Sequence, residues 1–213
     1  MTLSSQAMQS LASPREGIGA RQVRLCGTAL CGGTLVWAAS LATLGANPDT
    51  AIGISLGESA SLFFQLGLFA LLRVQLRTRA TGTSRVALAF LWVQHVLLAL
   101  ASLWTVLHGV ASAASLSWRH ATWLSVLDIF WPLSMLGMAL LGIPLALAGR
   151  WRGAARFWPL VAQSWAVVVV PTFLFVGPGK VADLLGAAHL VVGYAGLGLL
   201  LALRPLLTGA HVE

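Results

Sequence analysis

Several acidic and imidazole side chains lie inside or beside strongly apolar stretches of this sequence, where they could transfer protons. Glu58 is the clearest case, because it interrupts the stretch ISLGESASLFFQ together with small and hydroxyl residues. A carboxylate in such surroundings must be paired, hydrated or protonated, since an isolated charge in a low dielectric is costly. Ionisable residues in membrane segments usually face the protein interior or a wet cavity. The candidate catalytic residues are Glu58, as the proton donor, with Asp128, Asp183 and His189 in support.

The segments that must position these residues are long apolar runs. Of the 213 residues, 58% are hydrophobic and only 9% are charged, against about 25% charged in an ordinary soluble domain. A helix needs about 20 apolar residues to cross about 30 Å of hydrocarbon. The sequence therefore predicts an all-α polytopic membrane protein with six transmembrane helices, at 25–46, 52–73, 86–112, 122–149, 157–176 and 181–203.

The basic residues predict the orientation of this bundle. The formal net charge is +7, but the basic residues are distributed among the loops without a compact patch, which argues against a nucleic-acid partner. Of the 13 lysines and arginines, only Arg119 and Lys180 fall on one side, and the other 11 fall on the opposite side. The positive-inside rule then places both termini in the cytoplasm.

The chain divides into three parts. Residues 1–24 are polar and basic and lack the short apolar core of a secretory signal, so a flexible cytoplasmic tail is expected. Residues 25–204 form the six-helix domain, and residues 205–213 form a cytoplasmic C-terminal tail. The sequence contains no GxGxxG, P-loop, HExxH or CxxC motif. We therefore predict no metal site and no cofactor, with haem ligation kept as an alternative.

The depth of each ionisable residue follows from counting about 1.5 Å of helix rise per residue. With both termini inside, Glu58 lies roughly 10 Å below the outer boundary, and Asp128 lies at a similar depth. Asp183 falls close to the outer interface, where it could cap its helix, and His189 falls nearer the middle. Acids and imidazoles at this level predict a polar chamber in the outer half of the bilayer.

Helical periodicity predicts which side chains face that chamber. Glu58, Ser61 and Gln65 follow an i, i+3, i+7 pattern and form one polar stripe. His189 shares a face with glycines, including Gly193, that allow a neighbouring helix to pack closely around the imidazole. Both faces are therefore expected to point into the bundle.

Two histidines on the third apolar run compete for a place at the chamber. His95 and His108 are thirteen residues apart, which is about 220° around a helix, so only one can face it. The polar neighbours of His108, among them Thr105, favour His108. The candidate substrate-binding residues are Ser61, Gln65, His108, Trp104 and Trp131.

The fourth and fifth apolar runs resemble segments of a group of known proteins. The stretches PLSMLGMALLGI (132–143), AGRWRG (148–153) and FWPLVAQSW (157–165) resemble uncharacterised small six-span membrane proteins of high-GC bacteria. The resemblance covers these two helices only. It implies the six-span fold and a location in the bacterial cytoplasmic (inner) membrane.

A second resemblance is to rhomboid intramembrane proteases. That family also has six spans with both ends inside, and the resemblance implies that Ser134 and His189 occupy the places of its serine and histidine. Ser134 is not in a GxSG motif, and Ser61 and Gln65 stand where the family carries histidine and asparagine. Without these groups nothing evident activates the Ser134 hydroxyl as a nucleophile. This alternative is therefore a degenerate, rhomboid-like protein rather than an active protease.

A third resemblance is to membrane-bound terpene cyclases of the meroterpenoid type, which use acidic residues to protonate an isoprenoid. Glu58 and Asp183 are similar to that arrangement in kind, without a specific motif match. The resemblance implies that an acid in an apolar chamber protonates an alkene or epoxide.

The favoured hypothesis is a site that binds a lipid or isoprenoid-like small molecule. If the protein is an enzyme, the site transforms this molecule by carboxylate acid–base chemistry. The alternative is a non-enzymatic accessory or scaffold protein whose polar layer holds helices together. Two further hypotheses are a proton-coupled carrier and a haem-binding subunit that uses His95 or His108 with His189. The expected partner is a membrane lipid or lipophilic small molecule, and the sequence identifies no protein partner.

Overall fold

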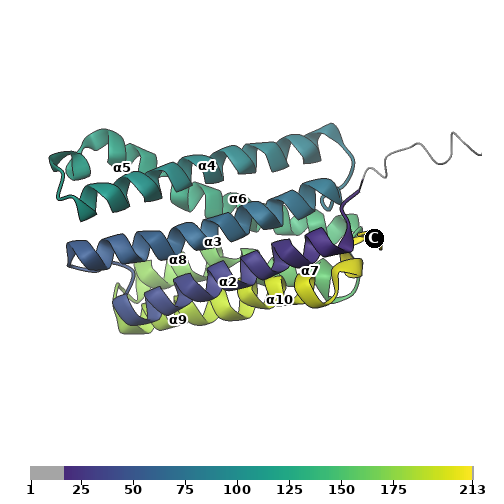
Figure 1. Cartoon of the computed structure of the whole chain (residues 1–213). Helices are drawn as coiled ribbons and strands as arrows, with labels where there is room; N and C mark the ends of the chain where they lie inside the picture. Colours follow the sequence, from purple (N-terminus) through teal and green to yellow (C-terminus); the bar gives the residue numbers. More distant parts are fainter. Residues whose placement is uncertain (1–16, 213) are drawn as a thin grey trace, which may run out of the picture.

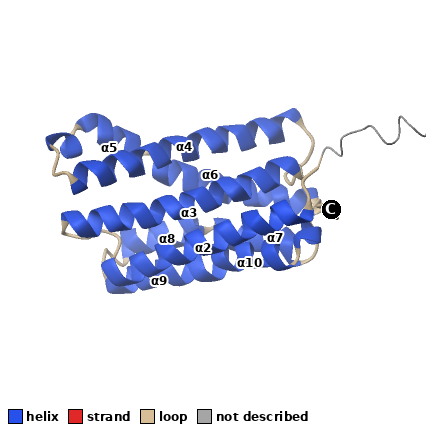
Figure 2. Cartoon of the chain, viewed as in Figure 1, coloured by secondary structure: helices blue, strands red, loops and turns tan. Residues whose placement is uncertain are grey.

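The computed structural model describes residues 17–212 as an elongated bundle of roughly parallel and antiparallel α-helices (Figure 1). The long helices are α2 (Ala20–Leu44), α3 (Ala51–Arg77) and α4 (Arg85–Ala113). They are followed by α5 (Thr122–Asp128), α6 (Phe130–Ala148), α7 (Ala154–Gln163), α8 (Trp165–Phe175), α9 (Lys180–Leu190) and α10 (Gly196–Leu203). Only short turns and loops separate the helices in Figure 2.

The predicted fold class is confirmed, because six segments are long and apolar enough to cross a membrane. They are Ala20–Leu44, Ala51–Arg77, Arg85–Ala113, Thr122–Ala148, Ala154–Phe175 and Lys180–Leu203. Large apolar side chains are exposed around the bundle, among them Ile52 at 74% and Phe175 at 88%. Such a surface suits lipid rather than water. The protein is therefore a multi-pass membrane protein.

Both ends of the described chain lie at the same end of the bundle (Figure 1). The Ala20 amide donates to the His211 carbonyl at 2.9 Å, and the Arg152 amide donates to the Leu207 carbonyl at 2.8 Å. The buried Trp151 indole donates to the Thr78 hydroxyl at 2.9 Å. We call this the arginine-rich end, formed by the loops 78–84 and 149–153 and both described chain ends. The opposite, distal end carries the loops 45–50, 114–121 and 176–179.

The tail boundaries differ in part from those expected. Residues 1–16 of the predicted N-terminal tail lie outside the described residues, whereas residues 20–24 already belong to α2. At the other end, Pro205–Thr208 forms a 3-10 turn with Pro205 and Thr208 buried. The described part of the predicted C-terminal tail thus packs against the start of α2.

Glycine allows α2 to lie against two neighbouring helices. A Cβ atom on Gly33 would be 2.2 Å from the Phe63 carbonyl oxygen of α3. On another face of α2, a Cβ on Gly27 would be 2.6 Å from the Gly198 oxygen of α10. Small residues at such crossings bring backbones into van der Waals contact, which is a main source of helix association in lipid.

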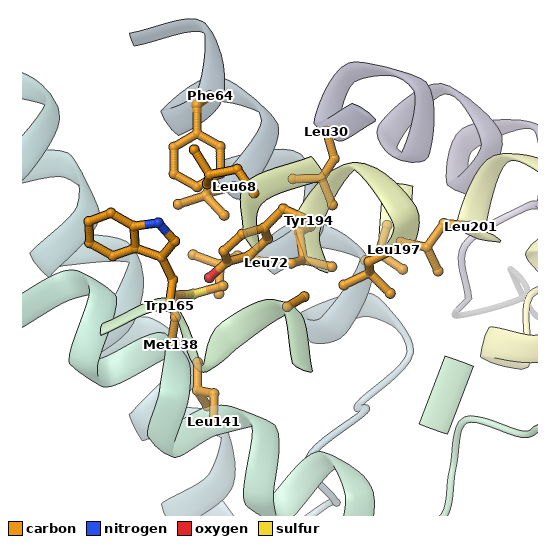
Figure 3. Packing of buried hydrophobic residues seen from close by; sticks show 14 of the residues in the cluster. Leu30, Phe64, Leu68, Leu72, Met138, Leu141, Trp165, Tyr194, Leu197 and Leu201 are labelled. Atoms are coloured by element: carbon orange, nitrogen blue, oxygen red, sulfur yellow. The ribbon is translucent and has the colours of Figure 1, made fainter. Parts of the chain in front are cut away.

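Large apolar side chains fill the centre of the bundle on the side of α2 and α3 that faces α6 and α10. Figure 3 shows Tyr194 among Phe64, Leu68 and Leu72, with Leu197 and Leu201 continuing the row. The Tyr194 and Phe64 rings meet edge to face with centroids 5.1 Å apart. This packed centre contrasts with the distal end, where the side chains enclose a cavity.

Three of the six spans are irregular. Span four breaks at Ile129, between α5 and α6, because Pro132 has no amide hydrogen to donate to the Asp128 carbonyl. Span five breaks at Ser164, whose hydroxyl donates to the Val161 carbonyl at 2.9 Å. Span six contains a π-helical segment, Val191–Ala195, which the sequence pattern does not predict.

Two adjacent glycines provide a matched test of the α2–α3 crossing. Gly33→Ala should destabilise the protein by about 1–3 kcal/mol, because the methyl group would collide with the Phe63 carbonyl. Gly32→Ala is the control, since its Cβ would have no atom within 4 Å. Reversible unfolding in detergent micelles measures both. Equal stability of the two variants would contradict the close crossing.

Candidate functional site: a tryptophan-walled cavity with two carboxylates

A cavity of about 640 Å³ lies at the distal end of the bundle. Helices α2, α3, α4, α5, α6 and α8 and two loops contribute to its walls. Its lining residues are Trp37, Ser40, Leu41, Gly45, Ala46, Asn47, Pro48, Ile54, Gly57, Glu58, Ser61, Trp104, His108, Asp128, Trp131, Trp165, Phe173 and Pro178. The cavity therefore brings together six of the nine candidate site residues, which come from the second, third and fourth spans.

Glu58 and His108 form a direct pair across α3 and α4. Glu58 Oε1 lies 2.7 Å from His108 Nδ1, and the two side chains are 15% and 25% exposed. Trp104, one turn before His108, stacks on the imidazole with ring centroids 4.9 Å apart and planes 11° from parallel. The hydrogen bond and the stacked ring together fix the orientation of His108.

The backbone of α4 comes close to Glu58 because a glycine follows His108. A Cβ on Gly109 would be 3.2 Å from the Glu58 Cβ atom. Beside it, the Ser55 hydroxyl hydrogen-bonds to the Gly109 carbonyl at 3.2 Å. A larger residue at 109 would push α3 and α4 apart and lengthen the contact between the carboxyl group and the imidazole.

Asp128 places a second carboxyl group on the cavity wall. It is the last residue of α5, directly before the break in span four, and it is exposed. Within residues 17–212, the Glu58–His108 pair is the only contact with ion-pair geometry. The Asp128 carboxylate is therefore free to meet a ligand.

Ser61 and Gln65 continue the polar stripe of α3, but only Ser61 lines the cavity. The Gln65 amide donates to the Thr105 hydroxyl at 2.8 Å and to the Ser61 hydroxyl at 3.3 Å. Both Gln65 and Thr105 are buried. Gln65 thus ties α3 to α4 beside the cavity, and it is not among the described lining residues.

Asp183 lies outside the described cavity lining and supports one of its loops instead. Its Oδ1 accepts a hydrogen bond from the Ala46 amide at 3.0 Å, and the residue is only 7% exposed. The cap of α9 is Gly179 rather than Asp183. Because residues 45–48 line the cavity, Asp183 acts on it through the backbone of this loop. The structure thus places Asp183 behind the cavity wall and not on it.

His189 is also placed elsewhere. Its Nε2 atom is hydrogen-bonded to the Ser164 hydroxyl at 3.1 Å, at the break between α7 and α8. The Ser134 hydroxyl donates instead to the Trp131 carbonyl at 2.8 Å, so the serine beside His189 is Ser164. His189 faces the bundle as predicted by its periodicity, but it does not belong to the lining of the described cavity.

His95 contacts its own helix rather than the cavity. Its Nδ1 atom lies 2.8 Å from the Leu91 carbonyl oxygen, and its ring lies beside Trp92 with centroids 5.4 Å apart. Of the two histidines on α4, His108 is therefore the one at the cavity. No group of three metal-ligating side chains occurs among residues 17–212.

Sequence reasoning missed two tryptophans, Trp37 and Trp165, that form much of the cavity wall. Trp37, Trp131 and Trp165 contact one another, with centroid separations of 5.5, 5.2 and 5.7 Å. Trp37 lies well inside its apolar run rather than at an end, where an interfacial anchor would lie. Its position in the middle of the run could have indicated that Trp37 lies inside the bundle.

A second hollow reaches Glu58 from the other side. It has a volume of about 270 Å³ and lies between α3 and α4. Its lining includes the exposed residues Ser59, Val106 and Val110. Glu58 therefore lies at the boundary between the main cavity and a groove on the lipid-facing surface.

Comparisons with protein-family models, curated proteins and solved structures find no match to this chain. The function must therefore be argued from the residues and geometry of the cavity.

The loop contact of Asp183 leads to a prediction. Asp183→Ala should destabilise the protein by about 1–3 kcal/mol, because it removes a charged acceptor from the Ala46 amide. It should also speed hydrogen exchange in residues 45–50, measured by mass spectrometry. Asp183→Asn keeps an acceptor oxygen and should show a smaller effect. Unchanged exchange in Asp183→Ala would contradict the supporting role.

Proposed function

We propose that this membrane protein binds a lipophilic small molecule in the distal cavity and transfers a proton to it. The observation that carries the proposal is the 2.7 Å contact between Glu58 and His108 inside a cavity walled by tryptophans. The proposed ligand class is a lipid or isoprenoid-like molecule. The proposed reaction class is acid-initiated isomerisation or cyclisation, such as membrane terpene cyclisation.

The size and lining of the cavity support a small-molecule ligand. Ligand sites typically measure about 300–1,000 Å³ and combine apolar walls with a few convergent polar groups. The volume of about 640 Å³ and the four lining tryptophans fit that description. The hollow between α3 and α4 gives a membrane-dissolved molecule a second approach to Glu58.

The pair of side chains supports proton transfer. A protonated Glu58 can give its proton to an alkene carbon, which leaves a carboxylate on Glu58 and a carbocation on the substrate. The indole faces stabilise that positive charge. Return of a proton from the substrate to the carboxylate restores the acid, so the net reaction rearranges the substrate without another reactant. His108 positions the Glu58 carboxyl group throughout.

A non-catalytic scaffold is the second candidate function, and two interhelical hydrogen bonds favour it. The Gln65 amide bonds to Thr105 between α3 and α4, and the Gln94 amide bonds to the Ser134 carbonyl between α4 and α6, both at 2.8 Å. In this alternative the polar residues only hold helices together, and Glu58 contributes stability alone.

Deuterium incorporation tests the proposed proton donor. Protein in lipid nanodiscs is incubated with geranylgeraniol in D₂O, and the recovered isoprenoid is analysed by mass spectrometry. Glu58→Gln should lower the rate of incorporation at least about 100-fold, because an amide cannot supply the proton. The control is Asp49→Asn, which removes an exposed carboxyl group at the same end of the bundle.

The outcomes separate the two candidate functions. A Glu58→Gln variant that is folded, binds tritiated geranylgeraniol and incorporates deuterium at the normal rate would end the proton-donor role. A wild-type protein that neither binds geranylgeraniol nor incorporates deuterium, with Glu58→Gln lowering only stability, would favour the scaffold.

The proposed location is the bacterial inner membrane, and the arginine distribution supports an orientation with both termini in the cytoplasm. Arginines such as Arg79, Arg85 and Arg150 cluster at the arginine-rich end, whereas Arg119 and Lys180 are at the distal end. The positive-inside rule places the richer end in the cytoplasm. The distal cavity would then open towards the outer side of the membrane.

Cysteine labelling tests this orientation. In a Cys26→Ser, Cys31→Ser background, Ala114→Cys in the distal loop should react with a membrane-impermeant maleimide on intact cells. Thr83→Cys at the arginine-rich end should react only after lysis, because the bilayer shields it. Both positions are exposed in the structure. The reverse pattern would overturn the orientation.

A further inference from the structure

We propose that the distal cavity selects a lipophilic cation, an amphiphile whose amine or quaternary ammonium group lies between the carboxyl groups and the tryptophans. The inference rests on the proposed function, since it assumes that the cavity takes a lipophilic molecule. It specifies in addition the charge of the ligand and the orientation of the ligand in the cavity.

The charges around the cavity favour a positive ligand. Glu58 and Asp128 line it, and none of the described lining residues is a lysine or an arginine. His108 is the remaining lining group that can carry a positive charge, and it is paired with Glu58. Whether Glu58 holds its proton or is paired with a protonated His108, the Asp128 carboxylate is left to pair with a cation from outside.

The basic residues at the distal end are engaged elsewhere. The Lys180 ammonium group donates to the Ala42 carbonyl at the end of α2. Arg119 hydrogen-bonds to His120, its neighbour in the turn Ser117–His120. Neither side chain lines the described cavity.

The aromatic wall fits the same ligand class. Trp37, Trp131 and Trp165 form a mutually contacting group, with centroid separations between 5.2 and 5.7 Å. Trp104 and Phe173 also line the cavity. The face of an aromatic ring carries negative electrostatic potential, and aromatic cages recognise quaternary ammonium groups for this reason.

The two hollows on either side of Glu58 assign an orientation to the amphiphile. The cationic group occupies the main cavity, where the carboxyl groups and tryptophans lie. The alkyl chain lies in the groove between α3 and α4, which Glu58 also lines, against Leu62, Val106 and Val110. The charged group is then enclosed by protein while the chain remains in contact with lipid.

A pair of probes with the same alkyl chain tests the inference. Binding of tritiated dodecyltrimethylammonium and tritiated 1-dodecanol is measured on protein in nanodiscs that contain no choline lipid. Empty discs give the background from partitioning into lipid. The cation should bind about tenfold more tightly than the alcohol, mainly because the Glu58 and Asp128 carboxyl groups attract its charge.

Variants identify the groups responsible for the selection. The double variant Glu58→Gln, Asp128→Asn should lose the preference for the cation while it still binds dodecanol, which also shows that it is folded. Asp49→Asn is the control and should keep the full preference, because this exposed carboxyl group is not among the lining residues.

Each outcome has a separate meaning. Equal binding of the two probes by wild type would overturn cation selection and leave the proposed lipophilic site standing. Binding of neither probe by a protein that also fails to bind geranylgeraniol would overturn the proposed function itself, whereas binding of geranylgeraniol alone would overturn the inference. A preference for the cation that survives in the double variant would overturn the role of the two carboxyl groups.

Discussion

A carboxyl group within an apolar bundle must share its charge or its proton with a neighbour, and in this protein the neighbour of Glu58 is His108. The small residue at Gly109 lets α4 come close enough for the contact, and Trp104 holds the imidazole plane. The distal parts of α3 and α4 are therefore joined by polar groups rather than by apolar packing. The cavity lies beside this polar pair, so the position of α4 and the shape of the cavity depend on one another.

The two ends of the bundle are built differently. Towards the arginine-rich end, α2 approaches α10 at glycine crossings, and leucines fill the space around Tyr194. At the distal end, tryptophans and loops surround an open volume instead. Most of the packing that stabilises helices in lipid is thus provided away from the cavity. Side chains at the distal end can serve ligand binding because they surround this open volume rather than fill it.

Much of the fold could be predicted from hydropathy, because a span requires a length and a composition that are visible in the sequence. Periodicity could also indicate that Glu58 and Ser61 share a face, and counting residues placed Asp128 at a similar depth. Neither periodicity nor residue counting could identify which neighbouring residue each helix face contacts. Asp183 lies against the backbone of Ala46 and His189 lies against Ser164, and both contacts depend on tertiary packing and on irregular helix geometry. The cavity role of Trp37 was missed because tryptophans in membrane proteins usually mark the interface.

The two helix breaks lie next to residues of the cavity wall. Ile129 separates α5 from α6 beside Asp128 and Trp131, and Ser164 separates α7 from α8 beside Trp165. Each break is a single residue between two helices, so the direction of α5 differs from that of α6, and the direction of α8 differs from that of α7. The breaks therefore decide how the carboxyl group of Asp128 and the indole of Trp165 are presented to the cavity, without a change in the directions of α6 and α7.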